Sequence, residues 1–122
     1  MTQNFTVHDR LPGMNEYTAN QRANRYAGNL MKRTAQKGVE AEIRAARLKP
    51  IKSPVTIIYT FYEPNKRRDK DNIAGFAHKV IQDALVSCGI LKDDGWNYII
   101  GFEDRFGISQ KHPRIEVELR YQ

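Results

Sequence analysis

Two aspartates that stand two positions apart, Asp69 and Asp71, are the side chains of this sequence best suited to chemistry. In an extended backbone, residues i and i+2 point to the same side, so both carboxylates can face one cation. A third carboxylate, Asp94, lies in an acidic turn further along the chain. Carboxylate oxygens suit a hard ion such as Mg²⁺, which keeps several waters and leaves room for a phosphate. The pattern indicates metal-assisted hydrolysis of a phosphate ester as a reaction class.

Basic side chains surround the first two aspartates, namely Lys66, Arg67, Arg68 and Lys70. Cations beside carboxylates are typical of sites that act on nucleic-acid phosphates. An Asp-x-Asp pair in a charged loop is nevertheless most often a solvated surface. The residues of this segment alone leave both interpretations open.

Charge is distributed unevenly over the 122 residues. Residues 1–68 hold 13 basic and 5 acidic side chains, whereas residues 69–122 hold 7 basic and 9 acidic ones. A basic half joined to an acidic cluster suits a protein that gathers phosphates and holds a metal. A merely solvated surface is the plainer interpretation of the same composition.

Length and composition limit the class of protein. A chain of this length suits a single domain, residues 1–122. The only cysteine, Cys88, excludes an intrachain disulfide and is typical of a reducing compartment. No apolar run reaches the roughly 18 residues of a membrane span, and the N-terminus has no signal pattern. We therefore expect a cytoplasmic protein with no membrane partner and, lacking a glycine-rich phosphate loop, no nucleotide cofactor.

The elements that must position the aspartates follow from hydrophobic patterning. Residues 5–8 favour a short strand, residues 19–48 a long helix with a bend at Gly28 or Gly38, and residues 55–62 a central strand covered on both faces. Residues 73–88 have the apolar spacing of a helix capped by Asp71 or Asn72 and ended by Gly89. Residues 98–105 and 114–121 favour two more strands.

This order predicts an α/β or α+β domain. We expect a single mixed four-stranded sheet, a long N-terminal helix and a second amphipathic helix.

Over most of its length the chain resembles the RusA-like Holliday-junction resolvases. The resemblance rests on an early Leu11-Pro12-Gly13 turn, the run from Lys66 to Ile73 that contains Asp-x-Asp-Asn, a helix with Lys79 and Asp83-Ala84-Leu85, and the pair Asp93-Asp94. The resemblance implies that Asp69, Asp71 and Asp94 are the catalytic, metal-binding carboxylates. Lys79 would be the catalytic lysine, although Gly75 stands nearer the place where the familiar bacterial enzyme has it.

The resemblance also implies a Mg²⁺-dependent endodeoxyribonuclease that acts in DNA recombination and repair, with Mn²⁺ as a substitute ion. Its partners would be a four-way DNA junction and a second copy of the chain, because an isologous dimer matches the two-fold symmetry of the junction. Lys66, Arg67, Arg68 and Lys70 would bind the DNA, and the origin would be bacterial or prophage.

Other interpretations remain open. The same scaffold can serve a non-catalytic protein that binds junction or duplex DNA, and a metal-dependent phosphohydrolase of nucleotides is a weaker third possibility. Lys79 and Asp83 are spaced for a surface ion pair on a helix. Cys88 falls on the apolar stripe, which favours a core residue over a nucleophile.

Overall fold

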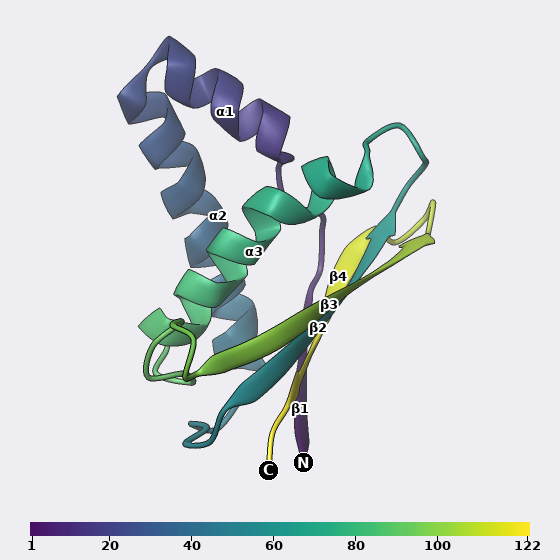
Figure 1. Cartoon of the computed structure of the whole chain (residues 1–122). Coiled ribbons are helices and arrows are strands. Elements are labelled where there is room, and N and C mark those ends of the chain that lie inside the picture. The colour runs from purple at the N-terminus through teal and green to yellow at the C-terminus, as the bar shows by residue number, and fades with distance from the viewer.

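In the computed structural model, which describes residues 1–122, one four-stranded sheet carries all the helices on one of its faces (Figure 1). The strands are β1 (Thr2–Val7), β2 (Val55–Glu63), β3 (Ile99–Ile108) and β4 (Arg114–Arg120), and the helices are α1 (Met14–Ala23), α2 (Arg25–Ala45) and α3 (Lys70–Ser87). The strand order is β1-β4-β2-β3, with β4 antiparallel to both neighbours and β2 parallel to β3. The predicted mixed sheet and α+β class are confirmed.

The central strand β2 supplies the middle of the core. Its side chains on the helix-covered face are at most 1% exposed: Val55, Ile57, Tyr59 and Phe61. Burial raises the pKa of the Tyr59 phenol, whose oxygen accepts a hydrogen bond of 3.2 Å from Gln82 on α3. No helix covers the other face of the sheet (Figure 1), so the central position is confirmed, whereas the expected cover on both faces is wrong.

The N-terminal helical segment is two helices and starts earlier than predicted. The break falls at Asn24, whose backbone is extended and whose Oδ1 accepts the N–H of Tyr26 at 2.8 Å. Gly28 does not bend α2. A Cβ there would lie 2.5 Å from Gln21 of α1, so the glycine lets the two helices approach closely. The predicted bend was therefore misplaced, because close packing, not backbone freedom, explains this glycine.

Helix α3 forms as the apolar spacing predicts. The seven large or small apolar residues from Ile73 to Leu85 on its inner face are buried against the sheet. Gly89 ends the helix with a φ of 74°, a left-handed conformation that favours glycine. Cys88 is half-buried against the core, and burial raises the pKa of its thiol. These surroundings support the interpretation of Cys88 as a packing residue.

Polar bonds hold α2 against α3. Lys32 of α2 pairs with Asp83 at 2.6 Å, so Asp83 does not form the expected pair with Lys79. The Ser87 hydroxyl donates to Glu40 Oε2 at 2.8 Å, and this bond is the main cause that lowers the pKa of Glu40. The two contacts fix α3 in place along its C-terminal half.

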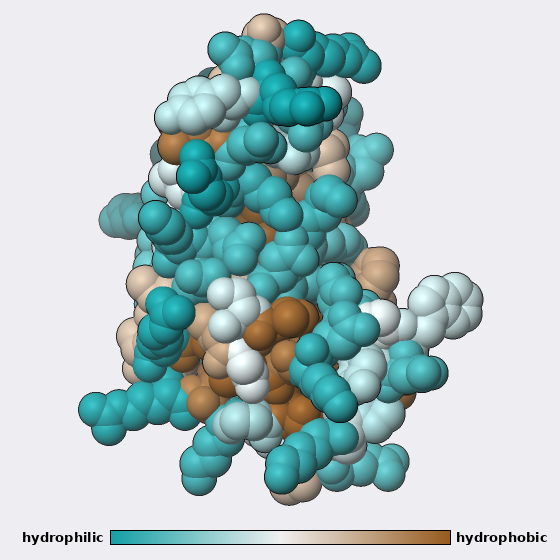
Figure 2. Space-filling view, turned by 90° about the vertical axis from the view of Figure 1, so that its left-hand side faces the viewer, coloured by the Kyte–Doolittle hydropathy of each residue, from teal (hydrophilic) through white to brown (hydrophobic).

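The surface over α1 and α2 is mainly hydrophilic, and hydrophobic surface gathers lower on the same side of the molecule (Figure 2). None of the three helices combines the length and apolar character that crossing a bilayer requires.

Candidate active site

A cleft of about 770 Å³ lies where α3 begins and where the parallel strands β2 and β3 end. Its lining includes Asp69 and Asp71 together with Lys66 and Lys70, and its apolar wall is the end of β3, Phe106–Ile108. Ligand sites of α/β sheets commonly lie at the carboxyl ends of parallel strands. The cleft therefore combines carboxylates and ammonium groups in one open depression.

The two aspartates reach this cleft through a local structure that differs from the predicted one. Asp69 is the N-cap of α3, with an extended backbone (φ −70°, ψ 154°) and no side-chain capping bond, whereas Asp71 already lies in the first helical turn. The cap is thus Asp69, and the predicted caps Asp71 and Asn72 lie inside the helix. The positive end of the helix dipole stabilises negative charge at both positions.

Neither carboxylate is occupied by a cationic side chain. Asp71 Oδ1 accepts the backbone N–H of Asn72 at 2.9 Å, and no lysine, arginine or histidine lies within salt-bridge distance of Asp69 or Asp71. Both residues are exposed. Four carboxylate oxygens therefore remain largely free to meet a ligand.

The early turn of the chain braces the start of α3. Asn72 Oδ1 accepts the backbone N–H of Asn15 at 2.8 Å. A Cβ on Gly13 would lie 2.7 Å from the same oxygen, so only glycine fits this contact without displacement. The Pro12-Gly13 turn and the Asn72 side chain thus dock the beginning of α1 on the first turn of α3, beside the two aspartates.

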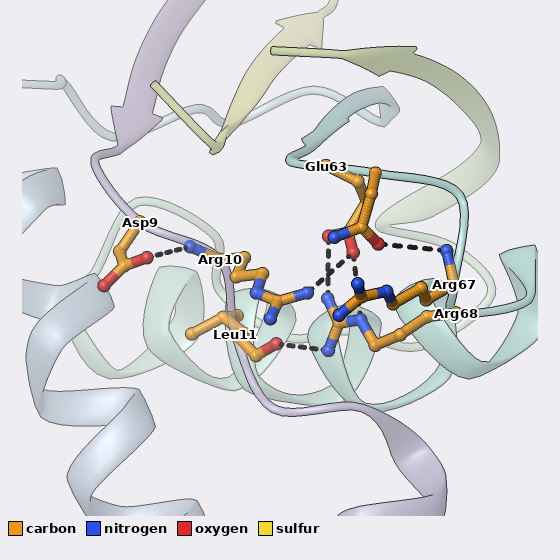
Figure 3. Close-up of polar contacts among 7 residues, drawn as sticks. Asp9, Arg10, Leu11, Glu63, Arg67 and Arg68 are labelled. Carbon is orange, nitrogen blue, oxygen red and sulfur yellow. Dashed lines mark hydrogen bonds and ion pairs between the residues drawn. The ribbon is translucent and has the colours of Figure 1, made fainter. Parts of the chain in front are cut away.

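A buried carboxylate that the sequence did not single out anchors the loop between β2 and α3 (Figure 3). Glu63 is 4% exposed, and Arg68 donates to both of its oxygens, at 2.9 Å from Nε and 2.7 Å from Nη2. Arg10 donates to Oε1 at 3.1 Å, and Arg68 Nη1 also donates to the Leu11 carbonyl at 3.0 Å. We call Glu63, Arg10 and Arg68 the arginine clamp.

The clamp separates Arg68 from the other basic residues of its segment. Its guanidinium is half-buried and engaged on three nitrogens, which leaves it little capacity to bind DNA. Lys66, Arg67 and Lys70 are exposed and take part in no ion pair. The Lys70 ammonium lies 5.4 Å from the centre of the Phe106 ring, which holds it over the wall of the cleft.

Asp94 and Lys79 do not join this cleft within the chain. Asp94 follows the far end of α3 and lines a second hollow of about 550 Å³ together with Trp96 and the start of β3. Lys79 is exposed on α3, about 12 Å along the helix axis from Asp71. No group of three or more metal-ligating side chains occurs in the chain. The structure thus unites Asp69 with Asp71 and leaves Asp94 and Lys79 apart from them.

Comparison with known proteins supplies the family. The family model described as "Endodeoxyribonuclease RusA" matches residues 12–120 of the 122 in the chain. The chain belongs to the RusA family. No curated protein matches the chain significantly.

The RusA match covers α1 to β4, and with them the cleft, the clamp and the second hollow. Membership of this family implies Holliday-junction resolvase activity, which is the cleavage of branched DNA by an endodeoxyribonuclease. A resolvase of this family generally uses a divalent metal. Cleavage of a phosphodiester is consistent with free carboxylates and ammonium groups in one open cleft.

Proposed function

We propose that this chain is a Mg²⁺-dependent, homodimeric resolvase of four-way DNA junctions in which Asp69, Asp71 and Asp94 hold the metal. The observation that carries the proposal is the cleft at the start of α3, where two exposed aspartates without cationic partners lie among free lysines in a RusA-family chain. Mn²⁺, another hard ion with oxygen ligands, would substitute for Mg²⁺.

The donor set of the cleft fits Mg²⁺. This ion binds one or two protein carboxylates, keeps several waters and takes its remaining ligands from a phosphate. Asp69 and Asp71 would hold it, since both are exposed and line the same cleft. The bound ion would activate water and neutralise charge at the scissile phosphate.

The chain's own cations would place the DNA backbone. Lys66 and Lys70 line the cleft beside the aspartates, and Arg67 stands exposed between Lys66 and the clamp. Their contribution is phosphate binding, which positions a substrate without reading its sequence. Lys79 is the proposed catalytic lysine, whose ammonium would stabilise charge that develops on the phosphate or on the leaving oxygen.

Arg68 takes a different part in the proposed site. Through Glu63 it holds the loop that carries Lys66 and Asp69, so it acts as a positioning residue. The clamp fixes where the carboxylates and lysines stand before DNA arrives, and such preorganisation lowers the cost of reaching the reactive geometry.

The three proposed metal ligands meet only if two chains contribute. Asp94 is separated from Asp69 by the length of α3, about 27 Å for its 18 residues. We therefore assign Asp94 to the cleft of the partner protomer, and each of the two symmetric sites would combine Asp69 and Asp71 of one copy with Asp94 of the other. Two such sites suit the two-fold symmetry of a four-way junction.

The test is cleavage of a labelled synthetic four-way junction with and without Mg²⁺. We expect paired nicks from the wild type, no cleavage by Asp71→Asn, and junction binding by that variant at least as tight as by the wild type, because it removes one negative charge. Asp93→Asn is the matched control, since Asp93 lies next to Asp94 and accepts only the Asp94 N–H, at 2.8 Å. Tight binding without cleavage under any divalent metal would identify a non-catalytic junction-binding protein instead.

A further inference from the structure

The outer edge of β3 is the open edge of the sheet. β3 pairs only with β2 (Figure 1), whereas the opposite edge is protected: the Gln3 side chain of β1 exchanges hydrogen bonds of 3.0 and 2.8 Å with the backbone of Lys49. An unprotected edge strand is a template for another strand. β3 also bears large apolar side chains in water, because Ile100 is 64% and Phe102 56% exposed.

The sequence of β3 is almost a mirror image about Asp104. Ile100-Gly101-Phe102 precedes the centre and Phe106-Gly107-Ile108 follows it, while Glu103 and Arg105 flank Asp104 with opposite charges. An antiparallel copy centred on Asp104 sets like apolar residues opposite each other and unlike charges opposite each other: Ile100 on Ile108, Phe102 on Phe106, and Glu103 on Arg105. A strand with this pattern is complementary to itself.

We propose that two copies of the chain join through β3, antiparallel and centred on Asp104, so that their sheets become one continuous sheet. The partner on this edge is thus a second copy of the same chain. The inference rests on the proposed function only for its consequence at the active site, and the interface itself is argued from the strand.

Backbone hydrogen bonding agrees with this register. Ser109, just past β3, donates its N–H to the Glu63 carbonyl of β2 at 2.8 Å. Backbone groups alternate between the two edges of a strand, so the odd-numbered residues of β3 face β2 and the even-numbered ones face outward. Centring on Asp104 pairs outward residues with outward residues.

Side chains select this register from its neighbours. A shift by two residues in either direction would also satisfy the backbone, but it would set Glu103 against its own copy or Arg105 against its own copy. Like charges directly opposite on two strands are destabilising. Within one chain Glu103 and Arg105 already form an ion pair, and the second copy would complete an alternating square of four charges.

One like-charged pair remains, because Asp104 meets its own copy on the two-fold axis. Each carboxylate accepts a hydrogen bond from the ring of His78 on α3, with Nε2 2.7 Å from Oδ1. This bond disperses the negative charge and holds the carboxylate toward its own helix, which reduces the repulsion across the axis.

The register has a consequence for the site that follows from the linings of the two hollows. The cleft of Asp69 and Asp71 ends on Phe106–Ile108, and the hollow of Asp94 ends on Ile100–Phe102. These two segments are the ones that the register sets opposite each other. The cleft of one protomer then adjoins the Asp94 hollow of its partner, as the proposed three-carboxylate site requires.

The test is the mass of the protein in solution, measured by sedimentation without DNA or metal. We expect a wild-type dimer, and for Glu103→Arg or Arg105→Glu a dissociation constant at least about tenfold higher, because two attractive cross-strand pairs become repulsive. The double variant Glu103→Arg/Arg105→Glu restores the pairing and with it the wild-type constant. Glu118→Arg is the matched control, since Glu118 pairs with Arg120 on its own strand in the same way but lies inside the sheet.

Three results would overturn the interface: a monomeric wild type at every concentration, singly reversed variants that dimerise as tightly as the wild type, or a double variant as weak as the single ones. Glu103 and Arg105 are about half exposed, so their reversal leaves the fold of the protomer intact. An intact dimer that never cuts a junction would refute the proposed function and leave the interface standing.

Discussion

The arginine clamp predicts a large loss of stability when Arg68 is shortened. In Arg68→Met the apolar stem is kept, but Glu63, whose side chain is 5% exposed, loses both short hydrogen bonds from the guanidinium. Removing one partner of a buried ion pair costs about 3–5 kcal/mol. Arg10 still donates to Glu63 at 3.1 Å, which places the expected loss at the low end, about 3 kcal/mol.

Urea unfolding followed by circular dichroism measures this loss. For a domain of this size we expect Arg68→Met to lower Tm by on the order of 10 °C. The double variant Glu63→Met/Arg68→Met should recover at least half of the loss, because it no longer buries an unpaired charge. A change below about 0.5 kcal/mol for Arg68→Met, which is typical of surface positions, would refute the clamp as an anchor of the loop.

Three further predictions concern stability and DNA binding. Ser87→Ala should cost about 1 kcal/mol at pH 7; because the pKa of Glu40 is lowered from 4.5 in the folded state, this difference should vanish in unfolding measurements as the pH falls below 4.5. Gly13→Ala should lower Tm by an overpacking cost of about 1–3 kcal/mol, whereas Gly38→Ala, with nothing within 4 Å of the new Cβ, should raise it; equal shifts would contradict the contact at Gly13. Lys66→Ala should reduce the slope of log affinity for junction DNA against log salt by about 1, and an unchanged slope would exclude a phosphate contact.

Patterns with a short period were sufficient to predict most of the fold. The apolar spacing of residues 73–88 gave α3 and its buried face, and the alternation of residues 114–121 gave β4 with Ile115, Val117 and Leu119 turned inward. The break at Asn24 had a usable signal, since asparagine is a favoured N-cap. Gly28 and Gly38, weak helix formers, drew the prediction away from it.

The arrangement of the candidate site depended on contacts between distant segments. Arg68 stands in a run of four basic residues, and nothing in that run distinguishes it from Arg67. Only the position of Glu63 at the end of β2 commits its guanidinium to a buried ion pair. Likewise, the place of Asp94 follows from the direction and length of α3, which spacing along the chain does not reveal.

Mixing two inactive variants tests the shared active site most directly. Asp71→Asn and Asp94→Asn are each expected to leave a junction uncut in the presence of Mg²⁺. After subunit exchange, a mixed dimer holds one site with both substitutions and one site with neither. The account predicts that the mixture regains single nicks in the junction but not paired ones. A mixture that stays inactive, although exchange is shown by mass, would contradict an active site built from Asp69 and Asp71 of one chain and Asp94 of the other.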